Sequence, residues 1–236
     1  MNILITNDDG YQSKGIKVLA EIMKQFGEVT VIAPKKHQSG MSMAVSLGFK
    51  QIAHKDLGEG WHNVDATPAS CVKFGLNTMF LDRFPDVVVS GINHGSNAST
   101  ASCYSGTLGA AFEATKNGIP AMAFSSAKND WLPTAEAHLV PIIRELLEAG
   151  QEPGEVWNVN FPARVPEDVV EILRDRSIAP YSMYQEYYIP EEQPDGSVDL
   201  GIGIKLVSND LLPEGSDAHA VRSGCISIGK VKDRVT

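Results

Sequence analysis

Short apolar runs with almost no polar interruption recur along the first two thirds of the chain. Runs of this kind are typical of strands that are buried on both faces of a parallel sheet. We predict such strands at residues 3–5, 29–33, 87–89, 120–124 and 156–161. Additional strands are expected at 44–47 and 61–64, in the region where the pattern is least clear, and a last one at 225–228.

Segments with helical periodicity lie between these runs. After the first run, apolar residues follow the i, i+3, i+4, i+7 rule of a helix that is buried on one face, namely Ile16, Leu19, Ala20 and Met23. This spacing predicts a helix over 12–26. Thr67 as a cap and Pro68 as a first helical residue predict another at 67–79, and further helices are expected at 105–116, 134–148 and 217–222. A helix between two buried strands implies a right-handed βαβ crossover. We therefore expect a single α/β domain over 1–236 with a Rossmann-like, doubly wound, mostly parallel sheet.

The alternation changes after about residue 165. Pro194-Asp195-Gly196 is a strong turn signal, and strand-like pieces flank it at 187–189 and 198–204. We predict a projecting C-terminal β-hairpin within 180–206. Because an isolated two-stranded hairpin is only marginally stable in water, we expect this hairpin to pack on another subunit.

Composition excludes several classes of protein. The net charge of −9 over 236 residues, without a dense Lys/Arg block, argues against a nucleic-acid surface. No apolar stretch approaches the ~20 residues of a membrane span, and the N-terminus does not resemble a signal peptide. The three cysteines are scattered without metal-ligand spacing, which suits a reducing cytoplasm and no disulfide framework.

Four of the predicted parallel strands end in polar, glycine-bearing or serine-bearing loops: Asp8-Asp9-Gly10, Gln38-Ser39-Gly40, Ser90-Gly91-Ile92-Asn93 and Ser125-Ser126. The carboxyl ends of parallel strands share one edge of a doubly wound sheet, where ligands bind. The side-chain ligands there would all be oxygens, from Asp8, Asp9, Ser39 and Asn93, and such a set suits Mg²⁺, Mn²⁺ or Ca²⁺. The alternative for Asp8-Asp9-Gly10 is an Asx-rich turn that caps the next helix.

Ser105-Gly106-Thr107 adds a candidate anion site at the start of a helix. The free N–H groups and the dipole of a helix N-terminus favour phosphate there. The alternative is an ordinary serine cap. Asn93 and Asn97 are equally compatible with turns, and His37 and His94 with solvated loop positions. The cysteines show no setting that would activate a thiol.

Several motifs together resemble the SurE (survival protein E) family. They are Ile3-Leu4-Ile5-Thr6-Asn7-Asp8-Asp9-Gly10, Ala33-Pro34 leading to Ser39-Gly40, Thr67-Pro68-Ala69-x-Cys71-Val72, Ser90-Gly91-Ile92-Asn93-x-Gly95-x-Asn97, Tyr104-Ser105-Gly106-Thr107 and Gly118-Ile119-Pro120-Ala121. The resemblance implies one divalent ion per subunit, Mg²⁺ or Mn²⁺, with Asp8, Asp9, Ser39 and Asn93 as its ligands. It also implies that Ser105, Gly106, Thr107 and Asn97 face a phosphate. Members of the family are cytoplasmic and form dimers or tetramers.

Three functions remain to be separated. The first is a metal-dependent phosphomonoesterase that acts on nucleoside 5′- or 3′-monophosphates, with Asp8 and Asp9 at its centre. The second is a non-catalytic, metal-linked nucleotide-binding module. The third is a receiver domain, which needs an aspartate at the carboxyl end of its third strand; Asp86 stands instead at the start of a strand, so we discount it.

Overall fold

The computed structural model describes residues 1–46, 51–127 and 132–233. Within these residues, one large sheet has nine strands in the order β3-β4-β2-β1-β5-β6-β7-β11-β8. Its centre is parallel and comprises β4 (Trp61–Val64), β2 (Glu28–Pro34), β1 (Asn2–Thr6), β5 (Val87–His94), β6 (Ala121–Ser126) and β7 (Glu155–Phe161). The order reverses about β1, so the doubly wound, mostly parallel α/β fold expected from the sequence is confirmed.

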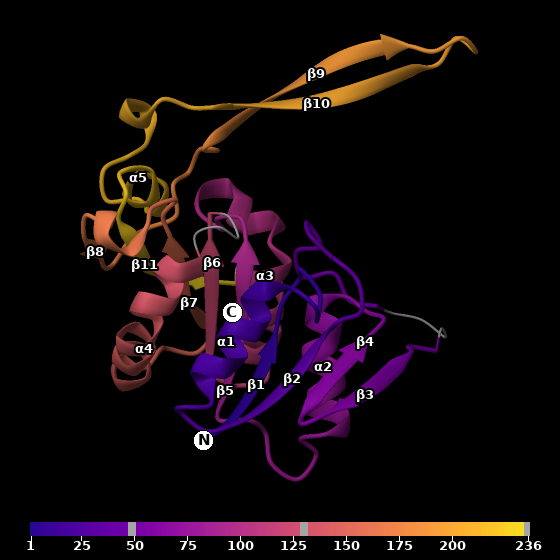
Figure 1. Ribbon diagram of the computed structural model, residues 1–236, viewed down its shortest axis with the longest axis vertical. Helices are drawn as coiled ribbons and strands as arrows, with labels where there is room; N and C mark the ends of the chain where they lie inside the picture. The colour runs from indigo at the N-terminus through magenta and orange to yellow at the C-terminus, as the bar shows by residue number, and fades with distance from the viewer. Residues whose placement is uncertain (47–50, 128–131, 234–236) are drawn as a thin grey trace.

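The two edges of the sheet depart from the parallel arrangement. On one edge, β3 (His54–Gly58) runs antiparallel to β4. On the other, β11 (Ile226–Lys232) runs antiparallel to β7 and carries the two-residue strand β8 (Ile172–Leu173) alongside it. Figure 1 shows these edges on opposite sides of the molecule.

Helices cover both faces of the sheet (Figure 1). One face packs against α1 (Lys14–Met23) and α4 (Leu132–Ala149), and the other packs against α2 (Pro68–Thr78) and α3 (Gly106–Lys116). A short helix, α5 (Asp217–Arg222), contacts β11 and β7. The described connections also contain the 3-10 helices η1 (Ser99–Tyr104), η3 (Pro166–Asp168) and η4 (Asn209–Leu211). No helix in the described part of the chain combines the length and the apolar character that a bilayer crossing requires.

The helices begin where their capping residues stand in the sequence. Ser13 accepts a hydrogen bond from the Ile16 amide at the start of α1, and Thr67 accepts one from Ser70 at the start of α2, where Pro68 is the first helical residue. Such caps satisfy backbone donors that have no partner within the helix. Ser105 caps α3 in the same way by accepting from the Leu108 amide, so each of these helix starts is determined by residues next to it in the sequence.

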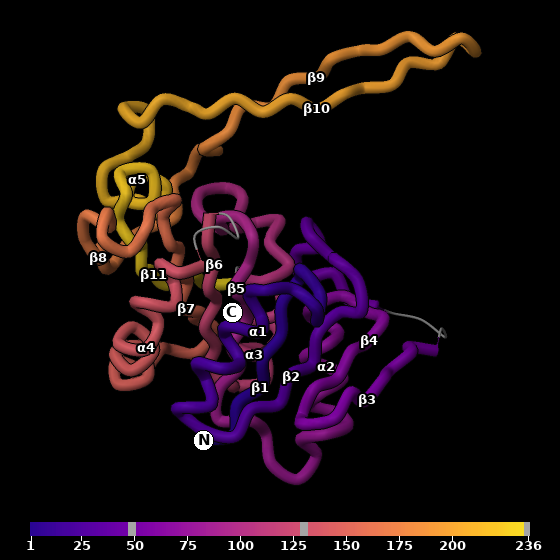
Figure 2. The backbone as a smooth tube through the Cα atoms, in the orientation of Figure 1, coloured from indigo at the N-terminus to yellow at the C-terminus, as the bar shows by residue number. Residues whose placement is uncertain are grey.

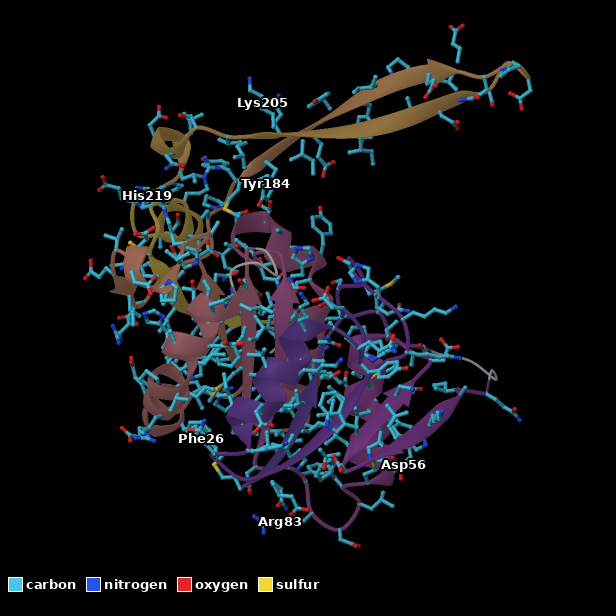
Figure 3. The ribbon with its side chains drawn as sticks, viewed as in Figure 1. Phe26, Asp56, Arg83, Tyr184, Lys205 and His219 are labelled. Atoms are coloured by element: carbon cyan, nitrogen blue, oxygen red, sulfur yellow. The ribbon has the colours of Figure 1, made fainter. Side chains whose placement is uncertain are left out.

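A separate two-stranded sheet projects from the body. It is an antiparallel hairpin of β9 (Tyr184–Glu192) and β10 (Val198–Leu206). Figure 2 shows it as an arm that extends beyond the α/β body, and Figure 3 labels Tyr184 and Lys205 near its base. Almost every residue of the two strands is exposed. The projecting hairpin that the turn signal predicts is confirmed.

Several details of the sequence prediction were wrong. Residues 44–46 form no strand, and Leu47 lies outside the described residues. The strand β3 was missed because it is entirely exposed and largely polar, so no apolar run marks it. Both β5 and β6 extend further than expected, which places 90–93 and 125–126 inside strands and not in loops.

Candidate active site

The turn after β1 is built around the side chain of Asn7. Its Oδ1 accepts a hydrogen bond from the Gly10 amide at 3.1 Å, and its Nδ2 donates to the Gly10 carbonyl at 3.0 Å and to Ser13 Oγ at 2.8 Å. Gly10 has a φ of 94°, a left-handed conformation that glycine adopts without strain. Asn7 therefore holds the turn closed, and neither Asp8 nor Asp9 is needed as its cap.

Asp8 lies against the first turn of α3. Its side chain is 3% exposed, and its Oδ1 accepts a hydrogen bond of 2.7 Å from the Thr107 hydroxyl. A Cβ atom at Gly106 would stand only 2.9 Å from the Asp8 Cβ, so this approach requires glycine. A carboxylate next to a helix N-terminus is favoured by the helix dipole. The acidic turn and the predicted anion site are thus one site.

Burial is the main cause that raises the pKa of Asp8, from 3.8 to about 6. The Thr107 hydroxyl lowers the pKa by stabilising the carboxylate, and the neighbouring charge of Asp9 raises it. The ionised form of Asp8 is therefore destabilised in the protein alone. A cation bound between the two carboxylates would offset both the burial and the repulsion.

Asp9 connects the ends of two neighbouring strands. Its Oδ2 accepts a hydrogen bond of 2.8 Å from the His94 amide at the end of β5, and its Oδ1 lies 3.4 Å from His37 Nδ1. The Asp9 side chain is 9% exposed, whereas that of His37 is 63% exposed. The protein therefore holds Asp8 through one oxygen and contacts Asp9 at both, so the acidic pair is kept in place from two sides.

The loop after β2 and the end of β5 bring the two other predicted ligands to the same edge. The Gln38 amide donates a 2.7 Å hydrogen bond to the Asp8 carbonyl, which places Ser39, an exposed residue, next to the acidic turn. Asn93 is buried, and its Nδ2 donates to the Gly95 carbonyl at 2.6 Å. Because the amide nitrogen is used in this way, Oδ1 is the Asn93 atom left to bind a cation.

The predicted phosphate residues differ in how much of their hydrogen-bonding capacity is already used. The Ser105 hydroxyl accepts from the Leu108 amide at 3.0 Å, which leaves its own hydrogen available. The Thr107 hydroxyl donates to Asp8. Asn97 is 5% exposed and donates one amide hydrogen to Ser125 Oγ at 2.8 Å, so its second amide hydrogen remains.

A cavity of about 650 Å³ adjoins Ser105. Its apolar lining includes Leu108, Phe112, Ile178 and Pro180.

Buried thiols take no part in the site: burial raises the pKa of both Cys71 and Cys225, which keeps them protonated. Among the described residues, no group of three or more His, Cys, Asp or Glu side chains is arranged to hold a metal. The predicted ligand set differs from such a group, because it combines the acidic pair with the neutral oxygens of Ser39 and Asn93.

The sequence prediction missed two residues that support this site through the main chain of Asn97. Asn158 and Asn160 lie on β7 and hydrogen-bond to the main chain of Asn97. The signal was present in the sequence as two asparagines at alternate positions within the otherwise apolar run 156–161. An amide in a strand that is buried on both faces needs a buried partner.

Comparison with known proteins agrees with the fold and the motifs. The family model described as Survival protein SurE matches residues 3–179. A "5'-nucleotidase SurE" from Flavobacterium psychrophilum is 35% identical over 99% of this chain and 92% of its own length, and one from Pelobacter propionicus is 37% identical over 97% and 92%. The crystal structure of the SurE protein from Aquifex aeolicus superimposes with a TM-score of 0.87 at 30% identity, covering 99% of this chain and 94% of that one. This chain therefore belongs to the Survival protein SurE family.

Proposed function

We propose that the chain is a divalent-metal-dependent phosphomonoesterase that hydrolyses nucleoside 5′- and 3′-monophosphates to nucleoside and phosphate. The observation that carries the proposal is the contact of Asp8 with Gly106 and Thr107, which joins an acidic pair to the N-terminus of a helix. A cation and a phosphate group can bind side by side at such a junction. The names of the curated relatives support the nucleotide substrate and the enzymatic activity.

The residues at the edge of the sheet suit one Mg²⁺ or Mn²⁺ ion per subunit. We assign Asp8, Asp9, Ser39 and Asn93 as its ligands, because they combine two carboxylates with neutral oxygens, the set that such ions prefer. The raised pKa of Asp8 supports this assignment, since an ionised Asp8 beside Asp9 requires compensation by a positive charge. When bound, the ion polarises the phosphoryl oxygens and lowers the pKa of an attacking water.

The start of α3 is assigned to the phosphate group. Gly106 lets the backbone approach Asp8 closely, and Thr107 fixes that carboxylate. The Ser105 hydroxyl accepts from the Leu108 amide and keeps its own hydrogen to donate to the phosphate. Asn97 contributes its remaining amide hydrogen. These donors stabilise the charge on the equatorial oxygens, because phosphoryl transfer depends mainly on positioning and electrostatics.

The acidic pair also supplies the proton acceptor. Asp8 Oδ1 is engaged by Thr107 and Asp9 Oδ2 by the His94 amide, which leaves Asp8 Oδ2 and Asp9 Oδ1 for the cation and the attacking water; Asp9 Oδ1 also lies 3.4 Å from His37 Nδ1. We assign the catalytic role to this pair. The cavity beside Ser105 has the size and the apolar lining of small-molecule sites, and we assign it to the nucleoside.

Phosphate release from nucleoside monophosphates, measured with Mn²⁺ or Mg²⁺ and with chelator, tests the proposal. Asp9→Asn should abolish release, whereas Asp82→Asn, which neutralises an exposed carboxylate that precedes β5, at the opposite end of that strand from Asn93, should retain wild-type rates. A non-catalytic nucleotide-binding module, which the relatives' names do not favour, would bind nucleotide without releasing phosphate. Absence of release with both metals would contradict the enzyme.

We further infer that the chain is a single domain whose hairpin joins subunits into a homodimer or homotetramer. Every second residue of β10 from Val198 to Leu206 is apolar, so these side chains share one face of the hairpin. On that face Tyr184 is opposite Leu206, Tyr188 opposite Ile202 and Pro190 opposite Leu200, and Glu186 and Glu192 are its charged members. Ile202 is 65% exposed. Contiguous apolar surface of this kind marks interaction sites, so this face should be covered by another subunit.

Deletion of residues 186–203 tests the role of the hairpin. It should convert the oligomer to a monomer in light scattering at micromolar concentration and leave the melting of the α/β body cooperative. A monomeric intact protein would contradict the inference.

We also propose that the protein works in the cytoplasm, which is supported by three free cysteines, one of them exposed.

A further inference from the structure

Two asparagine side chains occupy positions in β7 that the fold would otherwise fill with apolar residues. Asn158 is 3% exposed and Asn160 is fully buried. Both lie on the same face of the strand as Val156, which packs in the cluster beneath α2 and α3. Burying an amide group costs free energy unless its donors and acceptors find partners. The partners of these two amides therefore indicate why they are there.

Both amides hold the main chain of one residue, Asn97. The Asn97 amide donates to Asn160 Oδ1 at 2.7 Å, and Asn158 Nδ2 donates to the Asn97 carbonyl at 3.0 Å. Asn160 Nδ2 also donates to Asn158 Oδ1 at 3.3 Å, so the two side chains orient one another. Asn97 is thus bound through both of its backbone polar groups.

The sheet register places this network beside the candidate metal ligands. Ser125 on β6 is the neighbour of Asn93 on β5 and of Asn160 on β7. The Asn97 side chain donates to Ser125 Oγ. Asn97 is therefore hydrogen-bonded to two adjacent strands, β6 and β7, and the sheet register fixes these strands relative to the end of β5.

The next residues of the same loop are anchored separately. The Ser99 amide donates to Asp217 Oδ2 at 3.0 Å, and Asp217 Oδ1 accepts from the Ala179 amide at 2.9 Å. This buried carboxylate connects the loop to the C-terminal segments. The asparagine pair is hence not required to attach the loop to the body, and its specific effect is on Asn97.

We propose that Asn158 and Asn160 are positioning residues that fix Asn97 for contact with the phosphate of the substrate. The inference rests on the proposed phosphatase function. In this proposal β7 contributes no group to the reaction. Its two asparagines hold the Asn97 amide donor within the narrow range of positions that transition-state stabilisation needs. Apolar residues at 158 and 160 would preserve the core and release Asn97.

A double-mutant cycle tests this assignment. Asn160→Ala should lower kcat/KM for a nucleoside monophosphate roughly 10–100-fold, since a misplaced donor loses its charge-assisted hydrogen bond. In an Asn97→Ala background the same substitution should change kcat/KM by less than about twofold, because the group it positions is gone. Asn158→Ala should behave in the same way and serves as a second variant if Asn160→Ala does not fold.

Ser227→Ala is the matched control. Ser227 is fully buried beside Asn160 in the sheet, and among the described residues its hydroxyl has no hydrogen-bond partner. The substitution should leave kcat/KM unchanged. Equal losses from Asn160→Ala with and without Asn97 would show general damage to the fold and overturn the proposal, as would wild-type kcat/KM in Asn160→Ala.

Amide hydrogen exchange separates this inference from the proposed function. In Asn160→Ala the Asn97 amide should exchange at least tenfold faster, whereas amides in β1 should keep wild-type protection. If the wild type released no phosphate, the proposed function would fail while faster exchange at Asn97 would still support the positioning contact. Unchanged exchange at Asn97 would overturn the positioning role whatever the activity.

Discussion

Replacement of Asp8 by asparagine perturbs the electrostatics of the site without requiring a substrate. In metal-free protein, burial raises the pKa of Asp8 from 3.8 to about 6. The unfolded chain titrates this carboxyl near 3.8, so the folded state binds the proton more tightly. The resulting loss of stability is absent below pH 3.8, develops as the pH rises between the two pKa values, and is complete above pH 6.

The size of this effect follows from the shift. A difference of about two pKa units corresponds to about 3 kcal/mol. Asparagine has nearly the same shape, carries no charge, and keeps an oxygen that can accept from Thr107. Asp8→Asn should therefore be more stable than the wild type by up to about 3 kcal/mol at pH 8 without metal. For a chain of this length the melting temperature should rise by roughly 6–12 °C.

Urea unfolding followed by tryptophan fluorescence, in chelator and from pH 4 to pH 8, measures the difference. The gain from Asp8→Asn should shrink to nothing near pH 4, while Asp82→Asn should show no such pH dependence. Added Mn²⁺ should reverse the order, because it stabilises only the protein that binds it. A variant that is less stable than the wild type at pH 8 in chelator, or an offset that does not change with pH, would refute the electrostatic argument.

Three other substitutions test separate parts of the structure. Ser105→Ala should lower kcat/KM roughly 10–100-fold, with a stability loss of about 1 kcal/mol from the missing helix cap; wild-type kinetics would place the phosphate elsewhere. Gly106→Ala should abolish activity and metal-induced thermal stabilisation while circular dichroism stays unchanged, because its Cβ would displace Asp8; retained metal binding would contradict the tight contact. Ile202→Lys should dissociate the oligomer in light scattering, whereas Gln185→Lys on the opposite face of the hairpin should not; equal effects would exclude a one-sided interface.

The sequence predicts the fold well where a local pattern of residues is typical of a single kind of element. Buried parallel strands appear as apolar runs, and Thr67 and Ser105 stand as caps at the helix starts that the sequence predicts. The acidic pair could be placed at a sheet edge because Gly10 permits the chain to leave the strand there.

The rest could not be predicted because the decisive information is non-local. The exposed strand β3 is specified by pairing with β4 and not by its own composition. Nothing in the apolar run of β11 states that it runs antiparallel to β7. Likewise, the partners of Asn158 and Asn160 stand more than sixty residues away, at Asn97, so only the folded chain reveals what these asparagines do.

The central position of β1 has a consequence for how the protein is made. β1 pairs with β2 on one side and with β5 on the other, and the residues of β5 are synthesised long after those of β1. During translation one edge of this apolar strand stays unpaired, and such an edge can template aggregation. Closing the long intervening loop also slows folding. Nascent chains that end before residue 94 should therefore depend on chaperones that shield β1. Truncated forms of the protein that lack β5 should aggregate during expression.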